Sequence, residues 1–195
     1  MTILATREEI KKAVPLLELK WAVQNDNSDN ETRFIYFCQR LDQIVSLAHS
    51  NNADLGYAVH RWYNFQCSKQ VENIFCEFGA IHYPEEKDHD IDLTIDNIPF
   101  DIKLSVVSAQ YEGNKYLSKR ENKDKYMSWL KDKASKESRT HTKNKIFVVC
   151  DTIEGKCDFE QITEKVKNFM NYFKEKGYEY LGDDVCELIY IPTKK

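Results

Sequence analysis

The 195-residue sequence predicts an α/β protein, a mixed β-sheet flanked by helices with an N-terminal helical extension. Three observations predict it. Apolar residues recur at helical spacing through the first part of the chain, the period changes to two between residues 80 and 108, and helical and apolar strand segments then alternate. We expect residues 1–52 to form the extension and residues 53–195 to form one compact core.

The extension is expected to begin with two helices. Thr6 and Glu9 form a capping-box pattern that opens a helix over residues 6–24, which Pro15 should bend. Residues 25–30 are polar and predict a loop. A second helix is expected over residues 31–50. Its apolar stripe consists of Phe34, Phe37, Leu41, Ile44, Val45 and Ala48.

A third helix and a strand meander follow. The helix is expected from about residue 54 to residue 78, with Gly79 as its natural stop. Residues 80–83 are a short strand candidate. Residues 90–95 and 98–108 alternate apolar and polar side chains, which is typical of strands with one buried face.

The remaining elements alternate helix and strand. A helix is expected over residues 121–138, followed by a buried strand over residues 145–151. An amphipathic helix over residues 159–176 should end at Gly177. A last strand is expected over residues 186–192.

The two alternating strands should form a hairpin. Asp96 and Asn97 tolerate positive φ, so they suit a two-residue turn, and counting outward places Asp92 directly opposite Asp101. One face of the hairpin is apolar and holds Ile91, Leu93, Ile95, Phe100, Ile102 and Leu104. The other face is polar and holds Asp90, Asp92, Asp101, Lys103 and Ser105.

The polar face carries the chemistry. Residues directly opposite one another have Cβ atoms about 4.5–5.5 Å apart, and like charges so placed are destabilising. A divalent cation reverses the sign of that interaction, and Mg²⁺ is typically held by one or two carboxylates. Lys103 projects on the same side as Asp92 and Asp101. Its amino group could orient an attacking water, deprotonate it when neutral, or stabilise charge on a scissile phosphate when protonated.

The string DIDLTIDNIPFDIKLS resembles the signature of the PD-(D/E)XK nuclease superfamily, in which an Asp precedes a (D/E)-x-K element on the next strand. The resemblance implies a restriction-endonuclease-like fold and Mg²⁺-dependent phosphodiester hydrolysis, with Mn²⁺ able to substitute. It makes Asp92, Asp101 and the Ile102 carbonyl the metal ligands and places Lys103 beside the water. No proline precedes Asp92, and Asp90 is an alternative upstream ligand or a salt-bridge partner of Lys103.

Supporting residues are expected on both sides of the hairpin. Many members of the family carry a further carboxylate on the preceding helix, and Glu72 is the better candidate over Glu77 because it lies nearer the middle of that helix. Arg139, His141 and Lys143 lie between the basic helix and the next strand. They could grip nucleic-acid phosphates, or they could cap the helix end, where the dipole favours cations.

Charge and composition narrow the function class. The net charge is −4, but residues 103–145 carry twelve Lys/Arg against five Asp/Glu, so this segment could contact phosphates or form a solvated helix face. The six cysteines form no C-x-x-C pair, which argues against zinc or a disulfide framework. The sequence shows no signal peptide and no apolar stretch approaching a membrane span, so a cytoplasmic protein without a membrane partner is expected.

The leading hypothesis is a metal-dependent endonuclease of restriction or phage-defence type, with DNA favoured over RNA as substrate. Many members of the family are dimers, so the resemblance also allows a homodimer. One alternative is a catalytically inactive nucleic-acid-binding module on the same fold. Another is a protein-interaction domain whose basic helix meets an acidic partner.

Overall fold

The structure is a computed structural model that describes residues 4–20, 25–83, 91–136, 144–176, 180–181 and 184–193. The chain divides into two compact units, Met1–Gln70 and Val71–Lys195. The division falls inside one long helix, whereas the sequence-based boundary was placed at 52/53.

The first unit is helical. Thr6 accepts a hydrogen bond from the Glu9 N–H at 3.2 Å and caps the first helix, as the sequence predicted. Pro15 stands near the start of a 3₁₀ segment, so the predicted helix is split. The elements are α1 (Arg7–Lys11), η1 (Val14–Glu18), α2 (Asp26–Glu31), η2 (Arg33–Tyr36), α3 (Leu41–Ser50) and the greater part of α4 (Leu55–Glu77).

Two expectations for the first unit were wrong. Residues 25–30 were predicted to be a loop, but Asn25 accepts a hydrogen bond from the Ser28 N–H at 3.0 Å and so caps α2. The predicted helix over residues 31–50 breaks between η2 and α3. Its residues therefore no longer share one face, and the predicted stripe residue Phe37 is 83% exposed.

Helix α4 confirms the third predicted helix. It ends where expected, because Gly79 adopts φ +105°, a conformation that glycine reaches without a steric penalty. The Ala80 N–H then donates to the Phe75 carbonyl at 3.2 Å, which closes the helix in a Schellman arrangement.

The second unit contains a six-stranded mixed sheet with the order β1-β2-β3-β4-β6-β5. Its strands are β1 (Ile81–His82), β2 (Leu93–Ile95), β3 (Ile98–Val106), β4 (Lys145–Cys150), β5 (Tyr180–Leu181) and β6 (Asp184–Ile191). Strands β1, β2 and β3 pair antiparallel, β3, β4 and β6 pair parallel, and β5 pairs antiparallel with β6. The predicted α/β class with a mixed sheet is confirmed.

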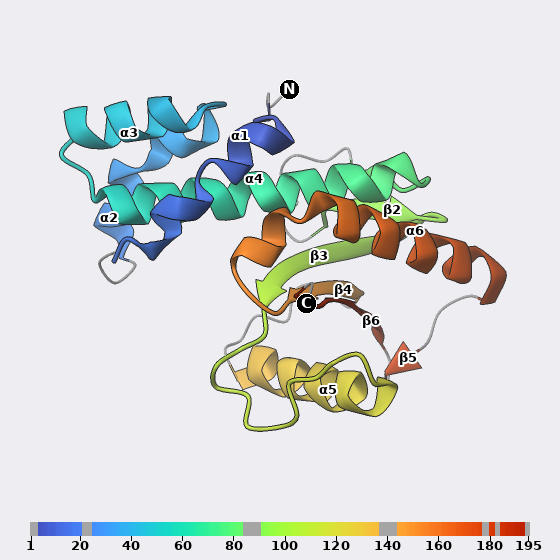
Figure 1. The fold of residues 1–195 in the computed structure, drawn as a ribbon. Coiled ribbons are helices and arrows are strands. Elements are labelled where there is room, and N and C mark those ends of the chain that lie inside the picture. The colour runs from blue at the N-terminus through green and yellow to red at the C-terminus, as the bar shows by residue number, and fades with distance from the viewer. Residues whose placement is uncertain are drawn as a thin grey trace. The chain divides into compact units, whose positions relative to one another are not determined.

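Helices cover both faces of this sheet (Figure 1). Helix α5 (Arg120–Lys136) lies on one face, where Tyr126 and Met127 pack in an apolar cluster with Val149 and Leu188. Helix α6 (Phe159–Lys176) lies on the other face. Along the chain it follows the short helix η3 (Glu154–Cys157). Among the described helices, none combines the length and apolarity needed to cross a bilayer.

The register of β3 and β4 decides which face the candidate site occupies. Lys103 pairs with Phe147 and Ser105 pairs with Val149, and paired residues project to the same face of a sheet. Phe147 and Val149 belong to the apolar cluster beneath α5. The polar side chains of β3 therefore project toward the α5 face.

Candidate active site

The β2–β3 hairpin forms in the predicted register. Leu93 pairs with Phe100 and Ile95 pairs with Ile98. Both turn residues have positive φ, 50° at Asp96 and 65° at residue 97, as a tight two-residue turn requires. The apolar face is buried as expected at Leu93, Ile95, Phe100 and Ile102.

The position of Asp92 differs from the expectation. The ladder ends at Leu93, so the predicted direct pairing of Asp92 with Asp101 is not formed. Instead, the Asp92 N–H donates to the Phe100 carbonyl at 2.9 Å, and the Asp92 carboxylate accepts the Ile102 N–H at 2.8 Å. The carboxylate thus lies at the edge of β3, beside the peptide that joins Asp101 to Ile102.

Asp101 is a buried carboxylate near the start of β3, with 5% of its surface exposed. The Lys103 ammonium donates to its Oδ1 at 2.7 Å, and the Lys145 ammonium lies 3.9 Å from its Oδ2. Burial raises the pKa of Asp101, and the negative charge of Asp92 raises it further, whereas Lys103 and Lys145 oppose the rise. Burial prevails, so the net shift is upward.

Lys103 reaches this carboxylate from the surface, since 53% of its side chain is exposed. An exposed ammonium beside a buried carboxylate can turn toward a ligand without crossing the core. Lys145 was missed as a site residue, although it opens the predicted strand at 145. Its proximity to Asp101 comes from the parallel β3–β4 pairing, which no local pattern encodes.

The oxygen atoms at this edge suit a hard divalent cation. The N–H and C=O of one strand residue point to the same side of the strand, so the Ile102 carbonyl faces the edge where the Asp92 carboxylate lies. Two carboxylates and a carbonyl match the preference of Mg²⁺ for oxygen. The described residues hold no cluster of three or more His, Cys, Asp or Glu side chains suited to a metal.

Glu72 and its alternative Glu77 differ in burial. Glu72 is 4% exposed on α4, whereas Glu77 is exposed. Its charge contributes to the raised pKa of the Cys76 thiol one turn further along, although burial of that thiol contributes more. Glutamate is almost never fully buried unless it is paired, so the burial of Glu72 keeps it a candidate, and its role in the site stays a prediction.

Several predicted residues cannot be placed. Arg139, His141 and Lys143, together with the alternative ligand Asp90, lie outside the described residues. Ser105, which shares the polar face, has a buried Oγ without a hydrogen-bond partner among the residues that the structure describes. A hydroxyl in that position can donate to or accept from a bound water.

Comparison of the chain with family models, with curated proteins and with solved structures finds no match.

All six cysteines are free thiols, and all but Cys76 are buried.

Proposed function

We propose that this chain is a Mg²⁺-dependent nuclease, a DNA endonuclease of restriction or phage-defence type, whose core belongs to the restriction-endonuclease-like folds. One observation supports the proposal most strongly. The β2–β3 hairpin brings the carboxylates of Asp92 and Asp101 together with the ammonium of Lys103, which donates to Asp101 at 2.7 Å. Metal-assisted hydrolysis of a phosphodiester uses oxygen ligands for the metal and benefits from a nearby cation.

In this proposal some residues hold the metal ion, and Lys103 contacts the water or the phosphate. The Asp92 and Asp101 carboxylates and the Ile102 carbonyl would hold Mg²⁺, and Mn²⁺ would substitute. When bound, the metal supplies Lewis-acid polarisation of the scissile phosphate. Lys103 would orient the attacking water or stabilise the negative charge on the phosphate.

The Lys103–Asp101 ion pair fits this division. In its absence, the buried Asp101 carboxylate would lack its closest counter-charge. If Asp101 held a cation, the exposed Lys103 side chain would be released to turn to the phosphate. Lys103 would thus change partner on binding of metal and substrate.

Nicking of supercoiled plasmid DNA in Mg²⁺ or Mn²⁺ tests the proposal. The Asp101→Asn variant should lose nicking, because an amide neither carries the charge nor replaces the carboxylate as a ligand. Asp132→Asn, which changes an exposed carboxylate on α5, is the matched control and should retain wild-type nicking. Undiminished nicking by Asp101→Asn would refute the assignment of the site.

An inactive nucleic-acid-binding module is the second candidate, and the same ion pair favours it. Lys103 already neutralises Asp101 without a metal, so the hairpin could serve as structure alone. Salt-sensitive binding to DNA, with no cleavage under any divalent cation, would favour this candidate. The absence of any affinity for nucleic acid at low salt would favour the protein-interaction domain instead.

A further inference from the structure

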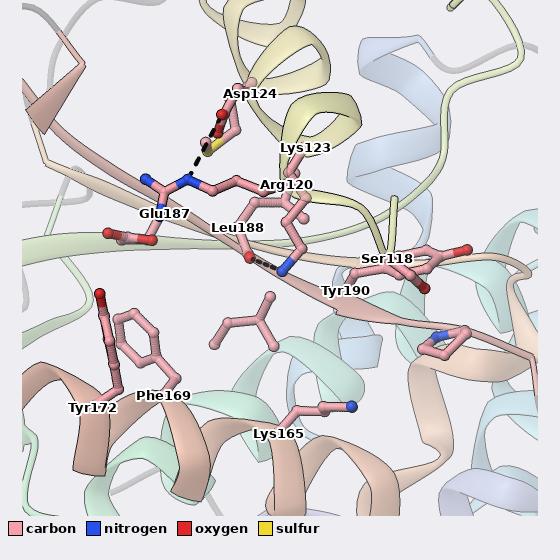
Figure 2. Close-up of a pocket in the computed structure, with 13 residues that line it drawn as sticks. Ser118, Arg120, Lys123, Asp124, Lys165, Phe169, Tyr172, Glu187, Leu188 and Tyr190 are labelled. Atoms are coloured by element: carbon pink, nitrogen blue, oxygen red, sulfur yellow. Dashed lines mark hydrogen bonds and ion pairs between the residues drawn. The ribbon is translucent and has the colours of Figure 1, made fainter. Parts of the chain in front are cut away.

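A second site lies along the outer edge of β6. A cleft of about 430 Å³ opens there between α5 and α6 (Figure 2). It is lined by β6 from residue 187 to residue 190, by the first turns of α5 and by α6. Asp101 is aligned across the sheet with Cys186, two strands away, so the cleft is separate from the candidate active site.

The cleft carries an excess of cations. Arg120, Lys123 and Lys165 face two carboxylates, Asp124 and Glu187, which leaves one net positive charge. The Arg120 Nε lies 3.9 Å from the Asp124 carboxylate, a loose ion pair. Opposite charges are therefore present, but they do not cancel.

Lys123 is the most constrained of the three cations. Its side chain is partly buried, and its ammonium donates to the Leu188 carbonyl at a long 3.4 Å (Figure 2). Burial lowers the pKa of Lys123. The charges of Glu187 and Asp124 oppose this shift, and those of Lys165 and Arg120 add to it. An ammonium has three donors, so an anion in the cleft could accept hydrogen bonds that the Leu188 carbonyl does not take.

The start of α5 gives an independent indication. Arg120 and Lys123 both lie in the first turn of this 17-residue helix. The helix dipole favours anions at that end, so cations there are unfavourable. Glu121 is exposed and pairs with Lys125 at 2.6 Å. A negatively charged ligand would satisfy both the dipole and the cations.

The cleft also has an aromatic wall. Phe169 and Tyr172 project from α6 toward β6, on the side opposite Lys123 (Figure 2). Cavities of a few hundred cubic ångströms suit small organic ligands, and exposed rings stack on planar groups. The cleft thus has the ammonium groups of Lys123 and Lys165 at one end and these two rings at the other, where the charged groups of Arg120 and Glu187 also lie.

We propose that this cleft binds a phosphomonoester attached to a planar ring, of the size of a nucleoside monophosphate. Lys123 and Lys165 hold the phosphate, and Phe169 and Tyr172 contact the ring. The same chemistry is offered by a free nucleotide and by the phosphorylated 5′ end of a nucleic-acid strand. The site does not depend on the proposed nuclease activity.

Amide NMR of the full chain during titration with adenosine monophosphate tests the proposal. The expected result is saturable shifts at the amides of Lys123, Leu188 and Phe169, with inorganic phosphate binding more weakly and adenosine weaker still. Lys123→Gln and Lys165→Gln should each weaken binding by about tenfold or more, the loss expected for a charge-assisted hydrogen bond.

Two neighbouring lysines provide matched controls. Lys125 and Lys167 lie two residues further along the same helices and are exposed, so Lys125→Gln and Lys167→Gln should leave the affinity unchanged. The spectrum of each variant without ligand reports whether it folds. Equal affinity in Lys123→Gln and Lys125→Gln would overturn the proposal, as would the absence of shifts at millimolar adenosine monophosphate.

An oligonucleotide series separates the two sources of the ligand. Tighter binding of a 5′-phosphorylated single strand than of adenosine monophosphate supports the proposal with a strand end as ligand. Equal or weaker binding of the strand supports it with a free nucleotide. If a strand without the terminal phosphate binds as tightly as the phosphorylated one and shifts the same amides, the cleft makes only general backbone contacts and the proposal is wrong.

Discussion

Two charged side chains of the second unit, one acidic and one basic, are buried to different extents. Asp101 on β3 is buried, and Lys123 on α5 is partly buried. Burial is the largest cause of the pKa shift in both, upward for the acid and downward for the base. Their partners differ. Asp101 receives a 2.7 Å hydrogen bond from the Lys103 ammonium, whereas Lys123 donates to the Leu188 carbonyl at 3.4 Å.

This difference separates a site whose buried charge is compensated by a short ion pair from one whose charge is only partly compensated. At Asp101, the proposed metal would have to compete with Lys103, so we expect its binding to need a substrate phosphate that attracts the lysine away. At Lys123, an anion would compete with one long hydrogen bond and with the charges of Glu187 and Asp124. The acidic site should therefore bind its cation weakly in the absence of substrate, while the basic site should bind its anion directly.

The largest effect is expected on catalysis at the compensated site. Lys103→Ala should lower the rate of plasmid nicking by about 10²–10⁴-fold, the usual contribution of a positioned acid–base group. Lys167→Ala removes an exposed lysine on α6 and should have no effect. If both variants nick at the wild-type rate, Lys103 has only a structural role.

The next effect is on stability at the same site. Lys103→Met should lower the free energy of unfolding by about 1–3 kcal/mol, because the buried Asp101 carboxylate loses its closest donor. Urea denaturation measures the change. Adding Asp101→Asn should restore most of the loss, because the buried charge is then gone. A double variant no more stable than Lys103→Met would argue against the ion pair as the cause.

The opposite result is expected at Lys123 in the cleft, where the charge is only partly compensated. Lys123→Met should leave the free energy of unfolding unchanged or raise it by about 1 kcal/mol, because it removes a desolvated charge and retains the apolar stem. The same urea titration provides the value. A loss comparable with that of Lys103→Met would show that the two sites do not differ in compensation.

The difference in the free energy of unfolding between Lys123→Met and the wild type should change with pH in one direction. Because the folded-state pKa of Lys123 is lowered, the cost of its charge is fully present below that pKa. As the pH rises toward the ordinary lysine value, the unfolded chain binds more protons than the folded one, and wild-type stability rises. The advantage of Lys123→Met over wild type should therefore shrink from neutral to alkaline pH. The other charged groups facing it, Arg120, Asp124, Lys165 and Glu187, are identical in both proteins. A gap that widens with pH would contradict this account.

The smallest effect concerns a buried group that is neutral at ordinary pH. Burial raises the pKa of the Cys150 thiol to about 12, so this thiol stays protonated and its burial requires no counter-charge. Titration of the native protein with a thiol reagent near neutral pH should modify Cys76 first, because the other five cysteines are buried. Rapid modification of Cys150 would show that burial at this end of β4 is incomplete.

The sequence predicted the sheet and its hairpin because their signals are local. The Asp96–Asn97 turn sets the register of β2 and β3, and Gly79 ends α4. The first unit was harder to predict. The apolar residues around Phe37 keep a helical spacing, but the structure has two separate helices there, η2 and α3. The two-residue strand β5 was missed because so short an element has no readable period.

The candidate site was predicted in composition and only partly in geometry. Asp101 and Lys103 share a face as expected, because side chains alternate along a strand. Asp92 turned to the Ile102 N–H because β2 begins at Leu93, three residues later than predicted, and strand ends depend on tertiary contacts. The cleft was not foreseen, although the basic residues at the start of α5 oppose the helix dipole and could have indicated it.

Manganese broadening of the amide NMR spectrum, measured with a DNA oligonucleotide present, tests the central claim most directly. The account predicts selective broadening at Asp92, Ile102 and Lys103 in the wild-type protein, and loss of that broadening in Asp101→Asn at the same manganese concentration. Broadening that spares these amides, or that persists unchanged in Asp101→Asn, would contradict a metal site on the hairpin.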